Sequence, residues 1–411
     1  MLPVRRLILV VAAVALVAAV PDGSAAIHWH RSRAVGLPFA GRLLHGVQLP
    51  ARGRFFETWD PALRHRPNRG WRRWGTDRLV ATVLHVVARY GRAHPHAPPV
   101  LISDLSRPHG GSFGAQYGAL GHASHQNGLD VDVYYPRRDR KLRPPTSPRQ
   151  IDLPLARDLL HRFLRAGVTR IFVGPNTSLR GPRRVVFPLV HHDNHMHIRF
   201  RRVTRRTIDG RSVRGRPIRA LELGFRGRDR VLVVGCIHGN ECAAQPVVRQ
   251  LERSTPPRFD LWVVPSLNPD GQARRLRQNA NGVDLNRNFP SQWTRMGTRG
   301  TAYYSGHTAS SEPETRFAER LILRLRPRVT IWFHQPQGVV RAWGGSVSTA
   351  RRFARFARVP FRAIPWPRGS GPNWQNHVLP HTASFVVELP GGPLGRAAAA
   401  RYARAVLRLA K

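Results

Sequence analysis

One change in composition divides this chain into two parts with different residue patterns. From Arg201 the apolar periodicity gives way to a run of Arg, Thr and Gly that continues through Gly215. Polar stretches of this kind are typical of links between domains. At 411 residues the chain also exceeds what one hydrophobic core usually serves. We therefore predict two folded domains, residues 27–204 and 205–411, behind a leader at 1–26.

The first predicted domain mixes helices and strands without regular alternation. A polar, Pro-rich stretch before residue 73 shows little periodicity, and residues 110–121 form a Gly-rich loop. Helical spacing and strand-like patterns follow one another irregularly. The pattern predicts an α+β domain, with helices at 79–94 and 153–166 and strands at 100–105, 128–135, 169–173 and 195–200.

The second predicted domain alternates apolar strands with amphipathic helices. Its strands are continuous apolar runs, as expected for strands buried on both faces. This alternation predicts an α/β domain whose mixed sheet is covered by helices on both faces. The expected strands are 231–234, 261–265, 329–333 and 383–387, and the expected helices are 241–253 and 311–325.

The formal net charge of +44 favours anionic partners. It comes almost wholly from Arg, because Lys occurs only at Lys141 and Lys411. The arginines are spread along the chain instead of forming a basic helix or arm, which disfavours nucleic-acid binding. Two interpretations stay open: adhesion to an anionic wall polymer, or a solvated surface that reflects a bias towards Arg codons.

The amino terminus has the pattern of an export signal. A short basic stretch ends at Arg6, residues 7–20 are apolar and uncharged, and small residues follow at 24–26. The apolar run is shorter than the ~20 residues that a membrane-spanning helix needs. We predict a cleaved signal peptide, no stable membrane anchor, and a mature protein in the periplasm, the cell wall or the medium. Arg5 and Arg6 leave both general and twin-arginine export open.

The chain contains two cysteines, Cys236 and Cys242. Export would permit a disulfide between them, but one pair does not define a disulfide-stapled scaffold. We predict two buried thiols that pack the end of a strand and the start of a helix.

Several residues of the first domain have the chemistry of a zinc site. A catalytic zinc takes three His or carboxylate ligands and keeps one position open. His125 and Asp132 supply two, and His195 and His197 lie two apart on a predicted strand, so both can face one site. One can bind the metal while the other acts as a base. By spacing alone, histidines on a polar surface would explain the pattern equally well.

The surrounding run resembles a known family. Residues 121–132 read GHASHQNGLDVD and residues 191–197 read HHDNHMH. Together with Gly110 and Gly111, they resemble the penicillin-insensitive murein endopeptidases, part of the lysostaphin-like and D-Ala-D-Ala peptidase group, over about residues 36–201. The resemblance implies a DD-peptidase-like fold. It also implies zinc on His125, Asp132 and His197, with His195 as catalytic base and with His122 and His192 at a second metal or in orienting roles.

The second domain carries a different candidate zinc set. His238 and Glu241 are three residues apart at a predicted strand-to-helix passage, and could hold one ion between them. His334 and Glu388 each follow a predicted strand, and strand ends of an open sheet converge on one crevice. His334 can complete the ligand set, and the Glu388 carboxylate can activate water.

A longer pattern in the second domain resembles the zinc carboxypeptidases. It comprises NPDG at 268–271, RQN at 277–279 and GVDLNRNFP at 282–290, and the resemblance extends from about residue 208 to the end. It implies zinc on His238, Glu241 and His334, Glu388 as general base and acid, and Arg277 polarising the scissile carbonyl. Asn286 and Arg287 would bind the substrate's free carboxylate, for which a planar guanidinium is suited. A surface salt bridge is the alternative role for Arg287.

Further residues indicate a branch of that family. Residues 303–306, 310–315 and 334–338 resemble the murein tripeptide amidases, which cut between D-glutamate and diaminopimelate. The mobile Tyr that usually precedes the catalytic Glu has no counterpart, because Trp374-Gln375-Asn376 occupies that stretch. How the site closes on a substrate is therefore left open.

Together these patterns predict an exported, bifunctional zinc peptidase acting on peptidoglycan peptides, with one zinc in each domain. The first domain would open crosslinks near diaminopimelate, and the second would trim stem peptides at the γ-D-glutamyl bond or at a carboxyl-terminal residue. One alternative is a general exported metallocarboxypeptidase with a non-catalytic, wall-binding first domain. A second is a non-enzymatic polycation with degenerate metal sites.

Overall fold

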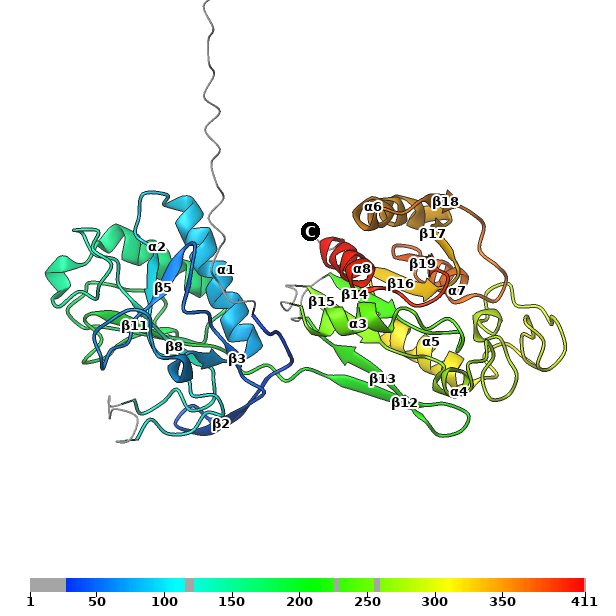
Figure 1. Cartoon of the computed structure of the whole chain (residues 1–411), viewed down its shortest axis with the longest axis horizontal. Coiled ribbons are helices and arrows are strands. Elements are labelled where there is room, and N and C mark those ends of the chain that lie inside the picture. Colours follow the sequence, from blue (N-terminus) through cyan, green and yellow to red (C-terminus); the bar gives the residue numbers. More distant parts are fainter. Residues whose placement is uncertain (1–26, 115–121, 225–228, 255–258, 410–411) are drawn as a thin grey trace, which may run out of the picture.

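The computed structural model describes residues 27–114, 122–224, 229–254 and 259–409. Two large sheets organise these residues (Figure 1), and residues 200–206 between them have no regular structure. The predicted leader at 1–26 and residues 115–121 of the predicted Gly-rich loop lie outside the described residues. None of the described helices combines the length and apolar character needed to cross a bilayer.

The first sheet has seven strands in the order β10-β9-β11-β8-β7-β5-β4. Helices α1 (Asp77–Ala93) and α2 (Leu153–Arg165) pack on it and share one apolar core with its strands. Thr76 caps α1 and Asp152 caps α2 by accepting a backbone N–H. The strands are β4 (Arg52–Gly53), β5 (Phe56–Thr58), β7 (Val100–Ile102), β8 (Asp130–Tyr134), β9 (Arg170–Val173), β10 (Val186–Pro188) and β11 (His195–Arg199).

The stretch before residue 73, which was expected to be irregular, contains short strands. β1 (Arg33–Leu37) pairs with β2 (Ala40–Leu44), and β3 (Val47–Gln48) pairs with β6 (Trp74–Gly75). Strands of two to five residues are too short to show a clear alternation in sequence. The described residues of this half also include the 3₁₀ turns η1 (Gly70–Arg72) and η3 (Pro148–Gln150).

The second sheet is mixed and has eight strands in the order β12-β13-β15-β14-β16-β19-β17-β18. Its central strands β15, β14, β16 and β19 are parallel, and all have buried residues along their length. The strands are β12 (Thr207–Arg211), β13 (Pro217–Glu222), β14 (Arg230–Val234), β15 (Asp260–Val264), β16 (Val329–His334), β17 (Gln337–Ala342), β18 (Phe361–Ala363) and β19 (Ala383–Pro390).

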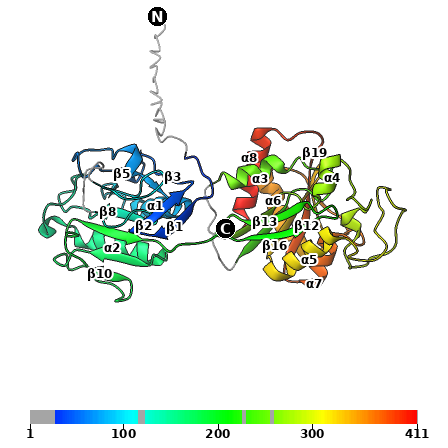
Figure 2. The same cartoon turned by 90° about the horizontal axis from the view of Figure 1, so that it is seen from below.

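Helices cover both faces of this sheet, as predicted. One core joins the sheet to α3, α6 and α8, and a second core joins its other face to α5 and α7. Figure 2 shows α3 and α8 on one side of β16, with α5 and α7 on the other. The helices are α3 (Gln245–Glu252), α4 (Pro269–Arg274), α5 (Pro313–Leu325), α6 (Val347–Ala357), α7 (Gly371–Val378) and α8 (Arg396–Arg408), with 3₁₀ turns η4 (Leu285–Arg287) and η5 (Gly344–Ser346).

The prediction that a helix begins at Glu241 is wrong. Helix α3 begins at Gln245, and Glu241 lies in the turn before it. Pro246 explains the difference, because proline is tolerated in the first turn of a helix but not in its interior. Glu241 is therefore held by a turn rather than by helical geometry.

Candidate metal centres

The second domain brings two histidines and two carboxylates to one edge of its sheet. His334 is the last residue of β16 and pairs in register with Glu388 on β19. His238 and Glu241 lie in the turn after β14, which neighbours β16. The carboxyl ends of parallel strands meet at the same sheet edge, and this placement makes the four side chains converge.

Three of these side chains meet at one point. The Nδ1 atoms of His238 and His334 lie 2.9 Å and 3.0 Å from Glu241 Oε2, and 3.2 Å from each other. Both rings thus turn the same nitrogen towards the carboxylate. Two imidazole nitrogens and one carboxylate oxygen form a donor set that suits a catalytic zinc with an open position. The residues therefore fit the metal that the sequence predicts.

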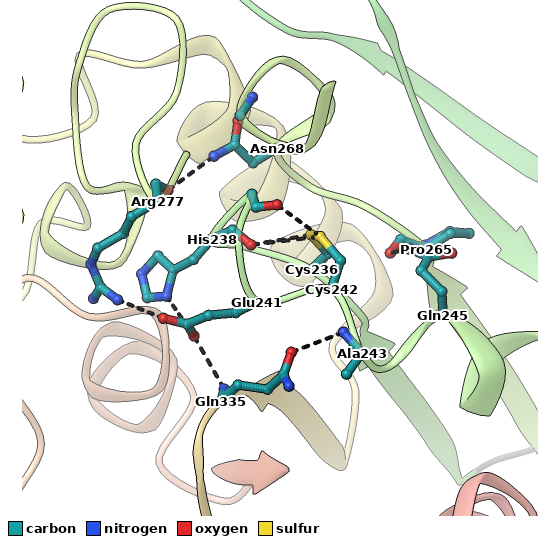
Figure 3. The surroundings of a disulfide bond; sticks show 12 residues. Cys236, His238, Glu241, Cys242, Ala243, Gln245, Pro265, Asn268, Arg277 and Gln335 are labelled. Carbon is teal, nitrogen blue, oxygen red and sulfur yellow. Dashed lines mark hydrogen bonds and ion pairs between the residues drawn. A yellow bond between two sulfur atoms is a disulfide. The ribbon is translucent and has the colours of Figure 1, made fainter. Parts of the chain in front are cut away.

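The turn that carries His238 and Glu241 is closed by a disulfide. Cys236 and Cys242 are joined, with Cα atoms 4.9 Å apart, and the prediction of two free thiols is wrong. The tight turn brings the two cysteines within the Cα separation that a disulfide requires. Cys236 Sγ also lies 3.2 Å from the His238 carbonyl oxygen (Figure 3). The bond thus encloses both predicted ligands in one short loop.

Asp284 belongs to this centre, although the sequence interpretation gave it no role. Its Oδ1 accepts a hydrogen bond from His238 Nε2 at 2.9 Å, which leaves His238 Nδ1 for the metal. Its Oδ2 accepts from Arg277 Nη2 at 2.9 Å. Burial opposes its ionisation, but the contacts with His238 and Arg277 hold the pKa of Asp284 below its usual range. Its place inside the GVDLNRNFP motif was the signal that could have identified it.

The three residues predicted to contact substrate line one cavity of ≈ 310 Å³ with the ligands. Arg277 Nη1 donates to Glu241 Oε1 at 2.7 Å. Asn286 Oδ1 accepts from the Gly371 backbone N–H at 3.0 Å, and Arg287 Nη1 donates to the Asn286 carbonyl at 2.8 Å. The Arg287 guanidinium faces the cavity rather than a surface carboxylate.

Glu388 is buried at the wall of this cavity. Among the described residues its Oε2 has no hydrogen-bond partner. Burial, and then the charge of Glu241, raise the pKa of Glu388 above its ordinary value, and Arg341 opposes them. Burial also lowers the pKa of His334, to about 4. Such a carboxylate has an open oxygen with which to accept a proton from water.

The first domain forms a second donor set across two antiparallel strands. Asp132 on β8 pairs in register with His197 on β11, and His197 Nδ1 lies 3.0 Å from Asp132 Oδ1. His125 Nε2 lies 3.2 Å from His197 Nδ1 and 3.4 Å from Asp132 Oδ2. The structure thus brings together the three residues predicted to hold zinc, and their atoms suit that metal.

Neighbouring groups set the orientation of these ligands. His125 has a left-handed backbone conformation, with φ 67°, and its Nδ1 donates to the Leu105 carbonyl at 2.6 Å. That bond leaves His125 Nε2 for the metal. His197 Nε2 lies 3.5 Å from Asp130 Oδ1. Burial opposes protonation of His197, but Asp130 and Asp132 raise its pKa to about 9.

The remaining predicted histidines also lie at this centre. His195 Nε2 is 3.9 Å from Asp132 Oδ1, and burial lowers the pKa of His195 to about 4. His122 Nδ1 is 3.9 Å from Asp132 Oδ2, and His122, His125 and Asp132 also have the proximity of a metal-binding group. The ring of His192 lies 4.7 Å from that of His195. The structure therefore places every predicted residue of this site, while their roles stay predictions.

A buried ion pair behind His122 was not predicted. Asp104 accepts from His122 Nε2 at 2.7 Å and forms an ion pair with Arg72, and the Arg72 and Asp104 side chains are fully buried. Burial opposes its ionisation, but Arg72 and His122 lower the pKa of Asp104 to about 2. The partners are far apart in sequence, and no motif connects them.

Comparison with known proteins finds a different family for each part of the chain. Residues 34–160 match the family model described as penicillin-insensitive murein endopeptidase, and residues 194–360 match the one described as zinc carboxypeptidase. These matches confirm both predicted resemblances. The first model ends before His195 and the second before Glu388.

Individual relatives agree with this division. Murein peptide amidase A of Escherichia coli (strain K12) is 35% identical over 139 residues, covering 31% of this chain and 57% of that protein. The penicillin-insensitive murein endopeptidase of Salmonella heidelberg (strain SL476) is 35% identical over 129 residues, covering 25% of this chain and 45% of that protein. The chain thus spans about half the length of these curated relatives.

The solved structures that match part of the chain include a murein-tripeptide amidase from Escherichia coli O157. It matches with a TM-score of 0.43 and 28% identity, covering 49% of this chain and 90% of that one.

Proposed function

We propose that this chain, whose two parts match murein endopeptidases and zinc carboxypeptidases, is an exported zinc peptidase with two active sites for peptidoglycan peptides. The first domain, with a DD-peptidase-like fold, opens peptide crosslinks near diaminopimelate. The second trims stem peptides at the γ-D-glutamyl bond or at a carboxyl-terminal residue. The observation that carries the proposal is that each domain holds a zinc donor set with a candidate base beside it.

In the second domain the residues divide the work of hydrolysis. Bound zinc supplies Lewis-acid activation of the scissile carbonyl and of water. Glu388 accepts a proton from water and later donates it to the leaving amine. Arg277 lies beside Glu241 and can turn a guanidinium N–H to the carbonyl oxygen. Asn286 and Arg287 hold the free carboxylate of the peptide.

In the first domain the base is an imidazole instead of a carboxylate. His195 is neutral at pH 7, because burial lowers its pKa to about 4, and it can accept a proton from water. His125, Asp132 and His197 hold the metal. His122 and His192 orient neighbouring groups or hold a second ion.

Digestion of defined muropeptides by full-length, zinc-loaded protein tests this function. We expect products of crosslink opening and of stem-peptide trimming, both lost with a chelator and identified by mass. His195→Ala should remove the first class of product alone, and Glu388→Gln the second alone. If only trimming is found, and His195→Ala leaves it unchanged, the chain is a carboxypeptidase whose first domain has a binding role. Absence of any cleavage would overturn the proposal.

A further inference from the structure

Arg341 faces the same cavity as the proposed catalytic residues of the second domain. It lies on β17, which runs antiparallel to β19, with Arg341 opposite Val386 and Val339 opposite Glu388. Residues two apart on a strand share a face, so Arg341, Val386 and Glu388 project to one side of the sheet. All three line the cavity. The sequence interpretation gave Arg341 no role.

The arginines of this cavity differ in the number of hydrogen bonds that their guanidinium groups donate to the protein. Arg277 donates to both Glu241 and Asp284. By contrast, Arg341 donates no hydrogen bond to any of the described residues, and its Nη1 lies 3.7 Å from Glu388 Oε1. A guanidinium carries five N–H donors, and a partly buried one that makes no hydrogen bond is well placed to bind an anion. Arg341 is such a group, with 22% of its side chain exposed.

The charges around the cavity indicate how many anionic groups it can accept. Arg277, Arg287 and Arg341 balance the carboxylates of Glu241, Asp284 and Glu388. If Zn²⁺ is bound and the histidines are neutral, the cavity would carry a net charge of about +2. A ligand with one carboxylate neutralises half of that charge, and a ligand with two neutralises it fully.

We propose that Arg341 binds a second carboxylate, carried by the side chain of the residue that the second site releases. This inference rests on the proposed carboxypeptidase or amidase activity, in which Asn286 and Arg287 hold the main-chain carboxylate. The preferred released residue is therefore a dicarboxylic amino acid. Glutamate and diaminopimelate share this chemistry, and the second adds an ammonium group. In this assignment Arg341 selects the side chain of the released residue. Its Nη1 lies 3.7 Å from Glu388 Oε1, which is too long for a hydrogen bond, so its N–H donors are open to a substrate carboxylate.

Hydrolysis of a matched peptide series tests this assignment. The zinc-loaded full chain is given γ-D-glutamyl dipeptides that end in glutamate, diaminopimelate, leucine or lysine. We expect kcat/KM for the dicarboxylic residues to exceed that for leucine by roughly 10-fold to 100-fold, the value of a hydrogen bond to a charged group. Arg341→Met should abolish the ratio, mainly through KM, and Arg341→Lys should restore part of it. Arg355→Met, which removes an exposed arginine from α6 on the other face, is the matched control and should leave the ratio unchanged.

Binding of the released amino acids gives a second readout that does not depend on turnover. Calorimetry should show tighter binding of L-glutamate than of L-leucine to zinc-loaded protein, and loss of that difference in Arg341→Met. Selective binding without hydrolysis would support the assignment and contradict only the proposed activity. If hydrolysis is unselective, or if Arg341→Met slows all four peptides equally, Arg341 acts only on Glu388 and the assignment is wrong.

Discussion

The two candidate sites bury proposed bases of opposite chemical type beside similar candidate zinc donor sets. Burial disfavours whichever form of a group is charged. It therefore raises the pKa of the Glu388 carboxyl and lowers that of the His195 imidazole to about 4. For His195 the shift increases the fraction able to accept a proton, whereas for Glu388 it decreases that fraction. Burial thus makes His195 more available, and Glu388 less available, to accept a proton at a given pH.

The sites also differ in what holds their ligands in place. In the second domain a disulfide encloses the His238 turn, and Asp284 accepts from His238 Nε2 at 2.9 Å. In the first domain Asp130 lies 3.5 Å from His197 Nε2, and no disulfide occurs in the described part of that domain. We expect the second centre to depend more on these supporting groups.

The largest expected effects come from removing one base at a time. Glu388→Gln should lower kcat for stem-peptide trimming by roughly 10²-fold to 10⁴-fold, the usual contribution of a general base. Crosslink opening should be unaffected, and His195→Ala should give the reverse pattern. Product masses from a single muropeptide digest measure both reactions together. Loss of both activities in either variant would mean that the two sites do not act independently.

Replacing the supporting carboxylates compares the two centres directly. Asp284→Asn should weaken zinc binding in the second domain by roughly 10-fold to 100-fold, as is usual for a carboxylate that orients a histidine ligand. Asp130→Asn should weaken zinc binding in the first domain less, because its contact with His197 is longer. Competition with a metal-sensitive dye measures both affinities. Equal losses of zinc affinity would show that the longer distance between Asp130 and His197 does not weaken the contribution of Asp130 to zinc binding.

The sequence predicted the secondary-structure elements that carry strong local patterns, and it named the residues that the structure brings together at each candidate site. The strands at 231–234 and 329–333 and the helix at 311–325 agree closely with β14, β16 and α5, because their apolar periods are unbroken. Short strands such as β3 escaped prediction, since two residues have no period. Asp104 and Arg72 also escaped, because a contact between residues 32 positions apart leaves no local signal.

Removing the disulfide should affect the second centre alone. Replacing Cys236 and Cys242 together by Ser frees the turn that holds two zinc ligands. The loss of loop-closure restraint for so short a loop corresponds to about 2 kcal/mol of folding free energy. We expect weaker zinc binding and slower trimming, with crosslink opening unchanged. The same measurements on wild-type protein after mild reduction are the control. Unchanged zinc affinity would show that Asp284 and the fold are sufficient to hold the turn.

The smallest expected difference lies in the pH dependence of the two reactions. Each base must be unprotonated to act, so each activity falls as the pH drops through the pKa of its base. Glu388 has a pKa raised above the ordinary glutamate value, whereas that of His195 is lowered to about 4. On acidification, trimming should therefore decline at a higher pH than crosslink opening, although an unperturbed His and Glu would give the opposite order. Profiles of kcat/KM between pH 4 and 8 measure the acidic decline of both reactions. Arg341→Met should move the decline of trimming to a still higher pH, because Arg341 favours the ionised form of Glu388. Crosslink opening that fails first would indicate that His195 is protonated more easily than its burial implies.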